Sequence, residues 1–152
     1  MRSKRGVVLE YELFEKLIED CKSRKPVLFE LGHDKTVSLF DIEKFENMID
    51  IKFSEKYKKL LSVYGGGLLG FANFYSLDEG SDYYLLNHNS VPVGEYLRIA
   101  DNGCGDYYLL CVEDNKCLDS LFFYDHDSNT VCITEYADIL EYLVEIGLGM
   151  KI

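Results

Sequence analysis

Residues 60–77 have the sequence LLSVYGGGLLGFANFYSL, and within this stretch the helical part of the chain gives way to strands. The apolar residues that lead into it share one face of a helix: Tyr57, Leu60, Leu61 and Tyr64. Glycine readily takes the left-handed conformation at a helix C-terminus, so residues 65–67 are predicted to end this helix. The aromatic residues of 70–77 then predict a strand. The stretch lacks charge, but three consecutive glycines argue against a membrane-spanning helix.

Two more helices are predicted upstream of this stretch. The first has an apolar stripe at helical spacing, made of Phe14, Leu17, Ile18 and Cys21. The second begins at Ser38, where the hydroxyl can cap the helix and Asp41 resembles the second half of a capping box. Its buried face continues through Ile42, Phe45 and Ile49. Ser54 can cap the helix that precedes the glycines.

The second half of the chain predicts a sheet and a closing helix. Strands are expected at residues 95–100, 107–112, 121–124 and 131–133, with a hairpin turn at 101–106. The continuous apolar run 107–112 predicts a central strand covered on both faces. The final helix has a stripe of Tyr136, Ile139, Leu140, Leu143 and Val144 and ends at Gly147. This order predicts one α+β domain over residues 1–152. Its central antiparallel sheet should have about four to six strands, with helices in the N-terminal third and at the C-terminus.

Charge and cysteine content narrow the classes of partner. The net charge is −11, which disfavours nucleic acid and anionic membranes and favours a basic protein partner. Five cysteines at irregular spacing, without a C-x-x-C pair, indicate reduced thiols. The apolar stretch near the N-terminus is too short for a signal peptide, so we expect a cytoplasmic protein.

No sequence motif supports catalysis or a cofactor. Gly65, Gly67 and Gly70 match G-x-G-x-x-G, but a helix precedes them and a strand follows, the reverse of a dinucleotide site. Residues 125–129 resemble the start of a calcium loop, yet the glycine and glutamate that such a loop requires are missing. His126, between two aspartates, has no nucleophile motif beside it. We therefore expect no enzyme activity, no metal and no cofactor.

The segment that follows residue 77 is a candidate for partner binding. It places acids beside tyrosines, and its candidate contact residues are Asp78, Glu79, Asp82, Tyr83 and Tyr84. Tyrosine offers a large contact area with little loss of side-chain entropy, and acids attract a cationic partner. The alternative is a solvated loop whose tyrosines lean on the sheet.

Several blocks of the sequence together resemble one known family. They are IEKFE at 42–46, IKFSEKY at 51–57, LLSVYGGG at 60–67, LRIADNGCGDYYLL at 97–110 and FYDHD at 123–127, followed by the C-terminal helix. In this order they resemble the SUKH superfamily, which includes fungal cell-wall-synthesis regulators and many bacterial immunity proteins. The residues that match its pattern are Tyr64, Gly65, Gly66, Asp101, Gly103, Gly105 and Asp106, which we interpret mainly as determinants of the fold.

The resemblance implies a function in protein binding. Bacterial members neutralise a cognate toxin by direct contact, so a toxin, basic or nuclease-like, is the implied partner. Phe53-Ser54 stands where the family usually has Leu-Pro, and the serine hydroxyl can cap the helix instead. Two alternatives stay open: a regulatory or scaffold module of the cell-wall-regulator type, and a small-molecule-binding domain with a pocket beside the sheet.

Overall fold

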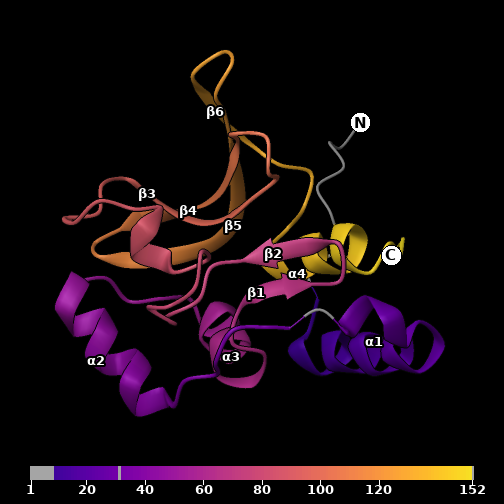
Figure 1. Ribbon diagram of the computed structural model, residues 1–152. Coiled ribbons are helices and arrows are strands. Elements are labelled where there is room, and N and C mark those ends of the chain that lie inside the picture. The colour runs from indigo at the N-terminus through magenta and orange to yellow at the C-terminus, as the bar shows by residue number, and fades with distance from the viewer. Residues whose placement is uncertain (1–8, 31, 152) are drawn as a thin grey trace.

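The computed structural model describes residues 9–30 and 32–151 as two antiparallel sheets and a set of helices. Helices α1 (Tyr11–Arg24), α2 (Leu39–Ile49) and α3 (Glu55–Val63) precede the strands, and 3-10 turn η1 (Pro26–Phe29) follows α1. Figure 1 shows these helices on one side, the large sheet on the other, and a small hairpin with the C-terminal helix between them. The predicted α+β class is confirmed.

The caps expected from the sequence set the starts of two helices. Ser38 Oγ accepts a hydrogen bond from Asp41 N–H at 3.1 Å, and Ser54 Oγ accepts one from Tyr57 N–H at 3.4 Å. A serine in this position satisfies one of the N–H groups that the first helical turn leaves unpaired. The start of each helix is therefore a local property of its own sequence.

The small sheet differs from the single strand predicted at 70–77. It is a hairpin of β1 (Gly67–Leu69) and β2 (Ala72–Phe74), and Gly67 pairs with Phe74. Gly70, with φ +61°, lies in the turn between the two strands. Gly67, the last of the three consecutive glycines, is already the first residue of β1. Beyond β2, Tyr75 N–H donates to the Ile99 carbonyl at 2.7 Å and joins the hairpin to the large sheet.

The large sheet has the order β3-β4-β5-β6, with every neighbouring pair antiparallel. Its strands are β3 (Tyr96–Asp101), β4 (Tyr107–Glu113), β5 (Lys116–Asp125) and β6 (Thr130–Ile133). β4 lies inside the sheet as predicted. Its neighbours Leu109 and Leu110 face opposite sides and are both buried, whereas the rest of the strand is half-buried or exposed, so the expected cover on both faces holds only at its middle. A short 3-10 turn, η2 (Leu85–Asn87), precedes β3.

The closing helix is shorter than its apolar stripe predicted. α4 (Ile139–Tyr142) begins after Asp138 and continues as a π-helical turn, η3 (Leu143–Gly147), while Tyr136 lies in the bend before it. Its residues join the buried core between the helices and one face of the large sheet. That core includes Phe14, Ile18, Ile42, Tyr57, Leu60, Leu61, Leu97, Ile99, Leu110, Leu121, Ile139, Leu140 and Leu143. Within the described part of the chain, no helix is long and apolar enough to cross a membrane.

Candidate binding surface

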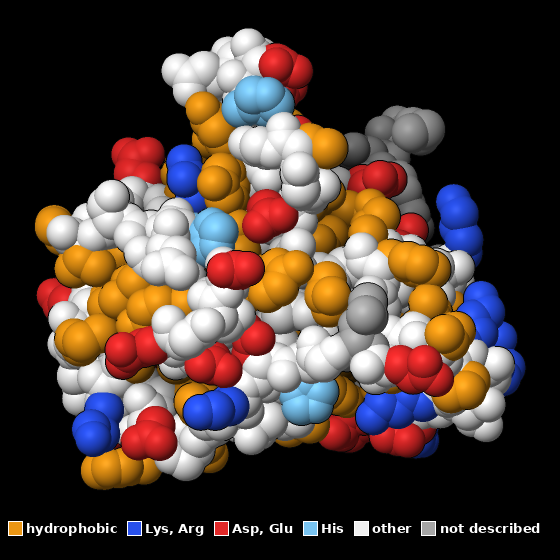
Figure 2. Space-filling model, viewed as in Figure 1, with side chains coloured by type: hydrophobic (Ala, Val, Ile, Leu, Met, Phe, Trp, Pro, Cys, Tyr) orange, Lys and Arg blue, Asp and Glu red, His pale blue; other side chains and the backbone are white. Residues whose placement is uncertain are grey.

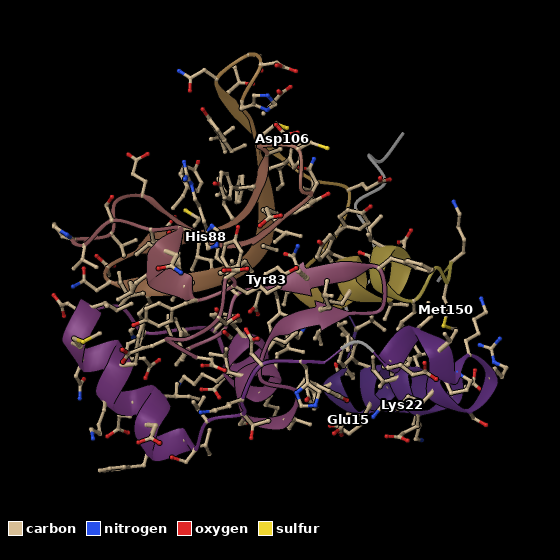
Figure 3. The ribbon with its side chains drawn as sticks, viewed as in Figure 1. Glu15, Lys22, Tyr83, His88, Asp106 and Met150 are labelled. Carbon is tan, nitrogen blue, oxygen red and sulfur yellow. The ribbon has the colours of Figure 1, made fainter. Side chains whose placement is uncertain are left out.

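Carboxylates from three separate segments meet around the half-buried Tyr83. Desolvation raises the pKa of the Tyr83 hydroxyl, and the negative charges of Asp101, Asp34 and Asp82 raise it further. Asp78 lies beside them, because its Oδ2 accepts from the N–H of Lys35, the residue after Asp34. Figure 2 shows acidic side chains gathered in the middle of this face, where Figure 3 labels Tyr83 and His88. We call this group, Asp34, Asp78, Glu79, Asp82 and Asp101, the acidic patch.

The loop predicted to bind a partner is held in one conformation by its own hydrogen bonds. Ser76 N–H donates to the Tyr83 carbonyl at 2.9 Å, and Ser76 Oγ donates to Asp34 Oδ2 at 2.6 Å. Asp78 Oδ1 accepts from Gly80 N–H at 3.2 Å. A loop fixed in this way presents its side chains without a large loss of entropy on binding.

The five predicted contact residues divide into two groups. Glu79 and Asp82 are exposed, whereas Asp78, Tyr83 and Tyr84 are half-buried. Tyr84 packs edge-on against Phe45 of α2, with ring centroids 6.3 Å apart. Two of the acids therefore face solvent, and Tyr84 leans on a helix and not on the sheet. That this segment binds a partner stays a prediction.

The glycines at the end of α3 are required by a close approach of the backbone. Gly65 has φ +86°, and a Cβ on it would lie 2.1 Å from the Asp34 carbonyl oxygen. Gly66 has φ +121°, and a Cβ there would lie 2.6 Å from Ser76 Cβ. Tyr64, the C-cap residue of α3, packs edge-on against Phe14 of α1. This block places the segment of Asp34 against the segment of Ser76, and so positions two parts of the acidic patch.

The other family block forms the turn between β3 and β4. Asp101 Oδ2 accepts from the Tyr75 hydroxyl at 2.6 Å, and its Oδ1 accepts from Gly103 N–H at 2.9 Å. Gly103 and Gly105 have φ of +77° and +94°, a conformation that favours glycine. Asp101 therefore organises the turn and contributes to the acidic patch at the same time.

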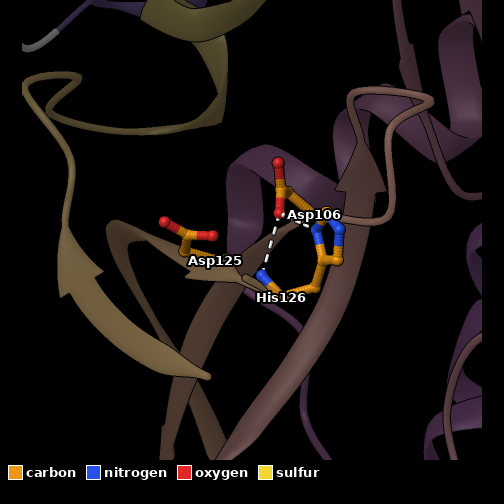
Figure 4. A group of neighbouring side chains, drawn as sticks. All are labelled: Asp106, Asp125 and His126. Atoms are coloured by element: carbon orange, nitrogen blue, oxygen red, sulfur yellow. Dashed lines mark hydrogen bonds and ion pairs between the residues drawn. The ribbon is translucent and has the colours of Figure 1, made fainter. Parts of the chain in front are cut away.

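A second cluster consists of Asp106, Asp125 and His126 (Figure 4). Their carboxylate oxygens and imidazole nitrogen, atoms of the kind that can ligate a metal ion, lie within 4.8 Å of one another. His126 Nδ1 lies 2.6 Å from Asp106 Oδ1, which also accepts from His126 N–H at 2.9 Å. These bonds and one from Asn102 lower the pKa of Asp106 to about 2, and the Asp106 contact raises the pKa of His126. These hydrogen bonds connect the β3–β4 turn to the β5–β6 turn, and this structural role explains why Asp106 and His126 lie together.

A groove lies on the outer face of the large sheet, where the sequence left a pocket open as an alternative but did not predict its residues. It has a volume of about 660 Å³ and lies between the strands and the loop 86–94. Its lining includes His88, Tyr96, Arg98, Tyr107 and Tyr124. The sequence did place Tyr96 and Arg98 two residues apart, and so on one face of a predicted strand. It did not show that tyrosines of the neighbouring strands lie beside them, because that depends on strand register.

These features define a class of protein, an α+β domain that presents acids and tyrosines on a rigid loop and on an open sheet face, a composition suited to protein binding. The chain belongs to the SMI1 / KNR4 family (SUKH-1), because the sequence profile of that family matches residues 36–145. No curated protein matches the chain in sequence.

Proposed function

We propose that this chain is an immunity protein that binds and neutralises a cognate toxin by direct contact. The acidic patch is the observation that carries the proposal, because residues 34, 78–82 and 101 are far apart in sequence and converge around Tyr83. Gathered negative charge attracts a basic partner and speeds its association. Membership of the SMI1 / KNR4 family (SUKH-1) supports the same role.

The proposed mechanism is occlusion without chemistry. The immunity protein covers the active site or the substrate groove of the toxin in the cytoplasm, and it needs no catalytic activity and no cofactor of its own. An interface of standard size, about 800 Å² on each partner, suffices for a stable complex. The exposed acids Glu79 and Asp82 make the first contacts, while Tyr83 and Tyr84 provide the fixed apolar surface behind them.

Co-expression tests this function directly. Candidate toxins, first any that is encoded beside this chain, are expressed in cells with and without it. For the cognate toxin we expect growth to be rescued and the two proteins to co-elute one to one. The variant Glu79→Lys with Asp82→Lys should lose rescue. The matched control, Glu12→Lys with Glu19→Lys on α1, makes the same change in net charge at exposed positions and should rescue normally. Failure of the unaltered chain to rescue or to bind any toxin domain would contradict the proposal.

A regulatory or scaffold role is the second candidate, because the superfamily that the sequence resembles also includes fungal cell-wall-synthesis regulators. It predicts weaker binding to several partners rather than one tight complex. Pull-down from cells that lack the neighbouring toxin gene separates the two: several partners retained at low affinity favour the scaffold.

A further inference from the structure

The outer face of the large sheet carries a cluster of half-buried tyrosines, Tyr96, Tyr107 and Tyr124. Side chains alternate between the two faces of a strand, so Tyr96 and Arg98 of β3 point to the same side. The register pairs Arg98 with Leu109 and Tyr107 with Tyr124, which adds the residues of β4 and β5 to that side. The loop 86–94 forms the wall of the groove above them.

Arg98 occupies this groove without an acidic partner. Its guanidinium carbon lies 4.0 Å from the ring centroid of Tyr107 and 5.7 Å from that of Tyr124. Among the described residues, no carboxylate lies within ion-pair distance of its guanidinium group, although the chain has 27 acidic residues. Stacking on a ring fixes the plane of a guanidinium group and leaves its N–H edge available to a carboxylate.

We propose that this groove receives a carboxylate side chain of the protein partner, which Arg98 holds through two parallel hydrogen bonds. The identity of that partner rests on the proposed function. A half-buried arginine among tyrosines has the composition of an interface hot spot. The partner then carries basic residues opposite the acidic patch and one aspartate or glutamate opposite Arg98.

The groove and the acidic patch form one continuous surface. His88, which lines the groove, stacks on Tyr75 at a centroid distance of 4.0 Å, and its Nε2 lies 2.9 Å from the Asp82 carbonyl oxygen. The Tyr75 hydroxyl in turn donates to Asp101 of the patch. Positive and negative contacts side by side fix the orientation of a partner and reject proteins with the wrong charge pattern.

The lining of the groove favours a protein side chain over inorganic phosphate. Asp101 lies three residues from Arg98 on the same strand, and the net charge of the chain is −11, so the repulsion of an anion and its attraction to Arg98 both grow with its charge. The tyrosine walls can contact the apolar part of an aspartate or glutamate side chain, a contact that inorganic phosphate cannot make.

The test is a titration of the ¹⁵N-labelled protein, followed by NMR, with the peptide acetyl-Ala-Glu-Ala-amide. We expect shift changes at Tyr96, Arg98 and Tyr107, and affinity about tenfold lower for the glutamine peptide. Arg98→Gln should lower the affinity for the glutamate peptide by the same factor. Arg98→Lys should have an intermediate affinity, because lysine keeps the positive charge but lacks the paired N–H groups of a guanidinium. The matched control is Arg24→Gln, which removes one charge from the exposed Arg24–Asp20 pair on α1 and should bind like the unaltered chain.

Four outcomes would overturn the inference: no shift changes in the groove, equal binding of the glutamate and glutamine peptides, equal binding by Arg98→Gln, or tighter binding of inorganic phosphate. Unchanged urea midpoints for the variants ensure that lost binding is not lost folding. The peptide titration requires no toxin, so its failure is distinct from failure of toxin rescue.

Discussion

At the scale of single residues, Gly65 and His126 occupy positions where few other residue types could replace them. Gly65 combines a positive φ with a backbone contact that leaves no room for a side chain. His126 joins the β5–β6 turn to the β3–β4 turn through Asp106. Both positions lie outside the acidic patch, yet each fixes a segment that borders the binding surface.

Gly65→Ala should destabilise the domain by more than about 2 kcal/mol, because the methyl group adds a clash to an unfavourable left-handed conformation. The Cβ would lie 2.1 Å from the carbonyl oxygen of Asp34. Urea unfolding measures the change. Gly32→Ala is the control, since no heavy atom lies within 4 Å of its Cβ position, and it should change stability by less than about 0.5 kcal/mol. Equal effects of the two substitutions would contradict this account of Gly65.

The His126 imidazole should titrate above its ordinary pKa of about 6.5. The hydrogen bond to Asp106 is the largest cause, and the charge of Asp127 adds a smaller contribution. NMR titration of the ring should therefore show a larger downward shift in pKa for Asp106→Asn than for Asp127→Asn. The reverse order would show that the pair does not hold in solution.

The same pair contributes to stability only within a pH window. The raised pKa of His126 means that its contribution is fully present below about pH 6.5 and is lost as the pH rises through the folded value. The lowered pKa of Asp106 means that its contribution is present above the ordinary value and is lost as the pH falls towards about 2. The tie between the two turns is therefore strongest at mildly acidic pH.

At the scale of elements, buried charges fasten the helices to one another. Glu46 of α2 is 3% exposed, and its carboxylate accepts from Phe53 N–H at 2.7 Å just before α3. Asp138 is 2% exposed, accepts from Glu141 N–H at the start of α4, and pairs with Lys56 of α3 at 2.5 Å. These contacts fix the relative positions of the helices, which the apolar stripes alone do not determine.

Asp138→Ala should cost about 3–5 kcal/mol, because it removes a helix cap and leaves the ammonium group of Lys56 without its partner. The free energy of unfolding in urea provides the measurement. Asp20→Ala breaks the exposed pair with Arg24, and it should cost at most about 1 kcal/mol. A loss at Asp138 as small as that at Asp20 would mean that the buried pair adds nothing beyond a surface pair.

At the scale of the whole molecule, the net charge of −11 and the acidic patch predict that association with a basic partner depends on salt. Raising the ionic strength from about 0.01 M to 1 M shortens the screening length from about 30 Å to 3 Å. Association with the toxin should therefore slow by about tenfold or more, while dissociation changes little. Stopped-flow measurements check this, and a rate independent of salt would remove the electrostatic part of the proposal.

Charge reversal at all three predicted acids, Asp78, Glu79 and Asp82, should reduce the association rate more than the stability. Asp78 also accepts hydrogen bonds from Lys35 and Gly80, so its reversal should add a stability loss that the double variant at 79 and 82 lacks. Association rates and urea midpoints of both variants separate the two effects.

The sequence by itself determined the features that depend on near neighbours. The serine caps of α2 and α3, the apolar stripes of the first three helices and the turn at 101–106 all follow from residues a few positions apart. The order of the helical and strand patterns predicted the α+β class, and the family blocks indicated the membership of the chain. The predicted continuation of the last helix back to Tyr136 failed because the buried Asp138, which pairs with Lys56 of α3, caps α4 at a later position.

Only the tertiary structure decided which distant residues lie together. Asp34 joins Asp82 and Asp101 because Gly65 lets two loops approach, and Arg98 meets Tyr107 because the strand register pairs β3 with β4. Periodicity assigns a side chain to a face of its own strand, but it contains no information about which strand becomes the neighbour. The candidate binding surface is made of such long-range contacts. For that reason the sequence indicated the loop 78–84 but not the segments that join it, nor the residues of the groove.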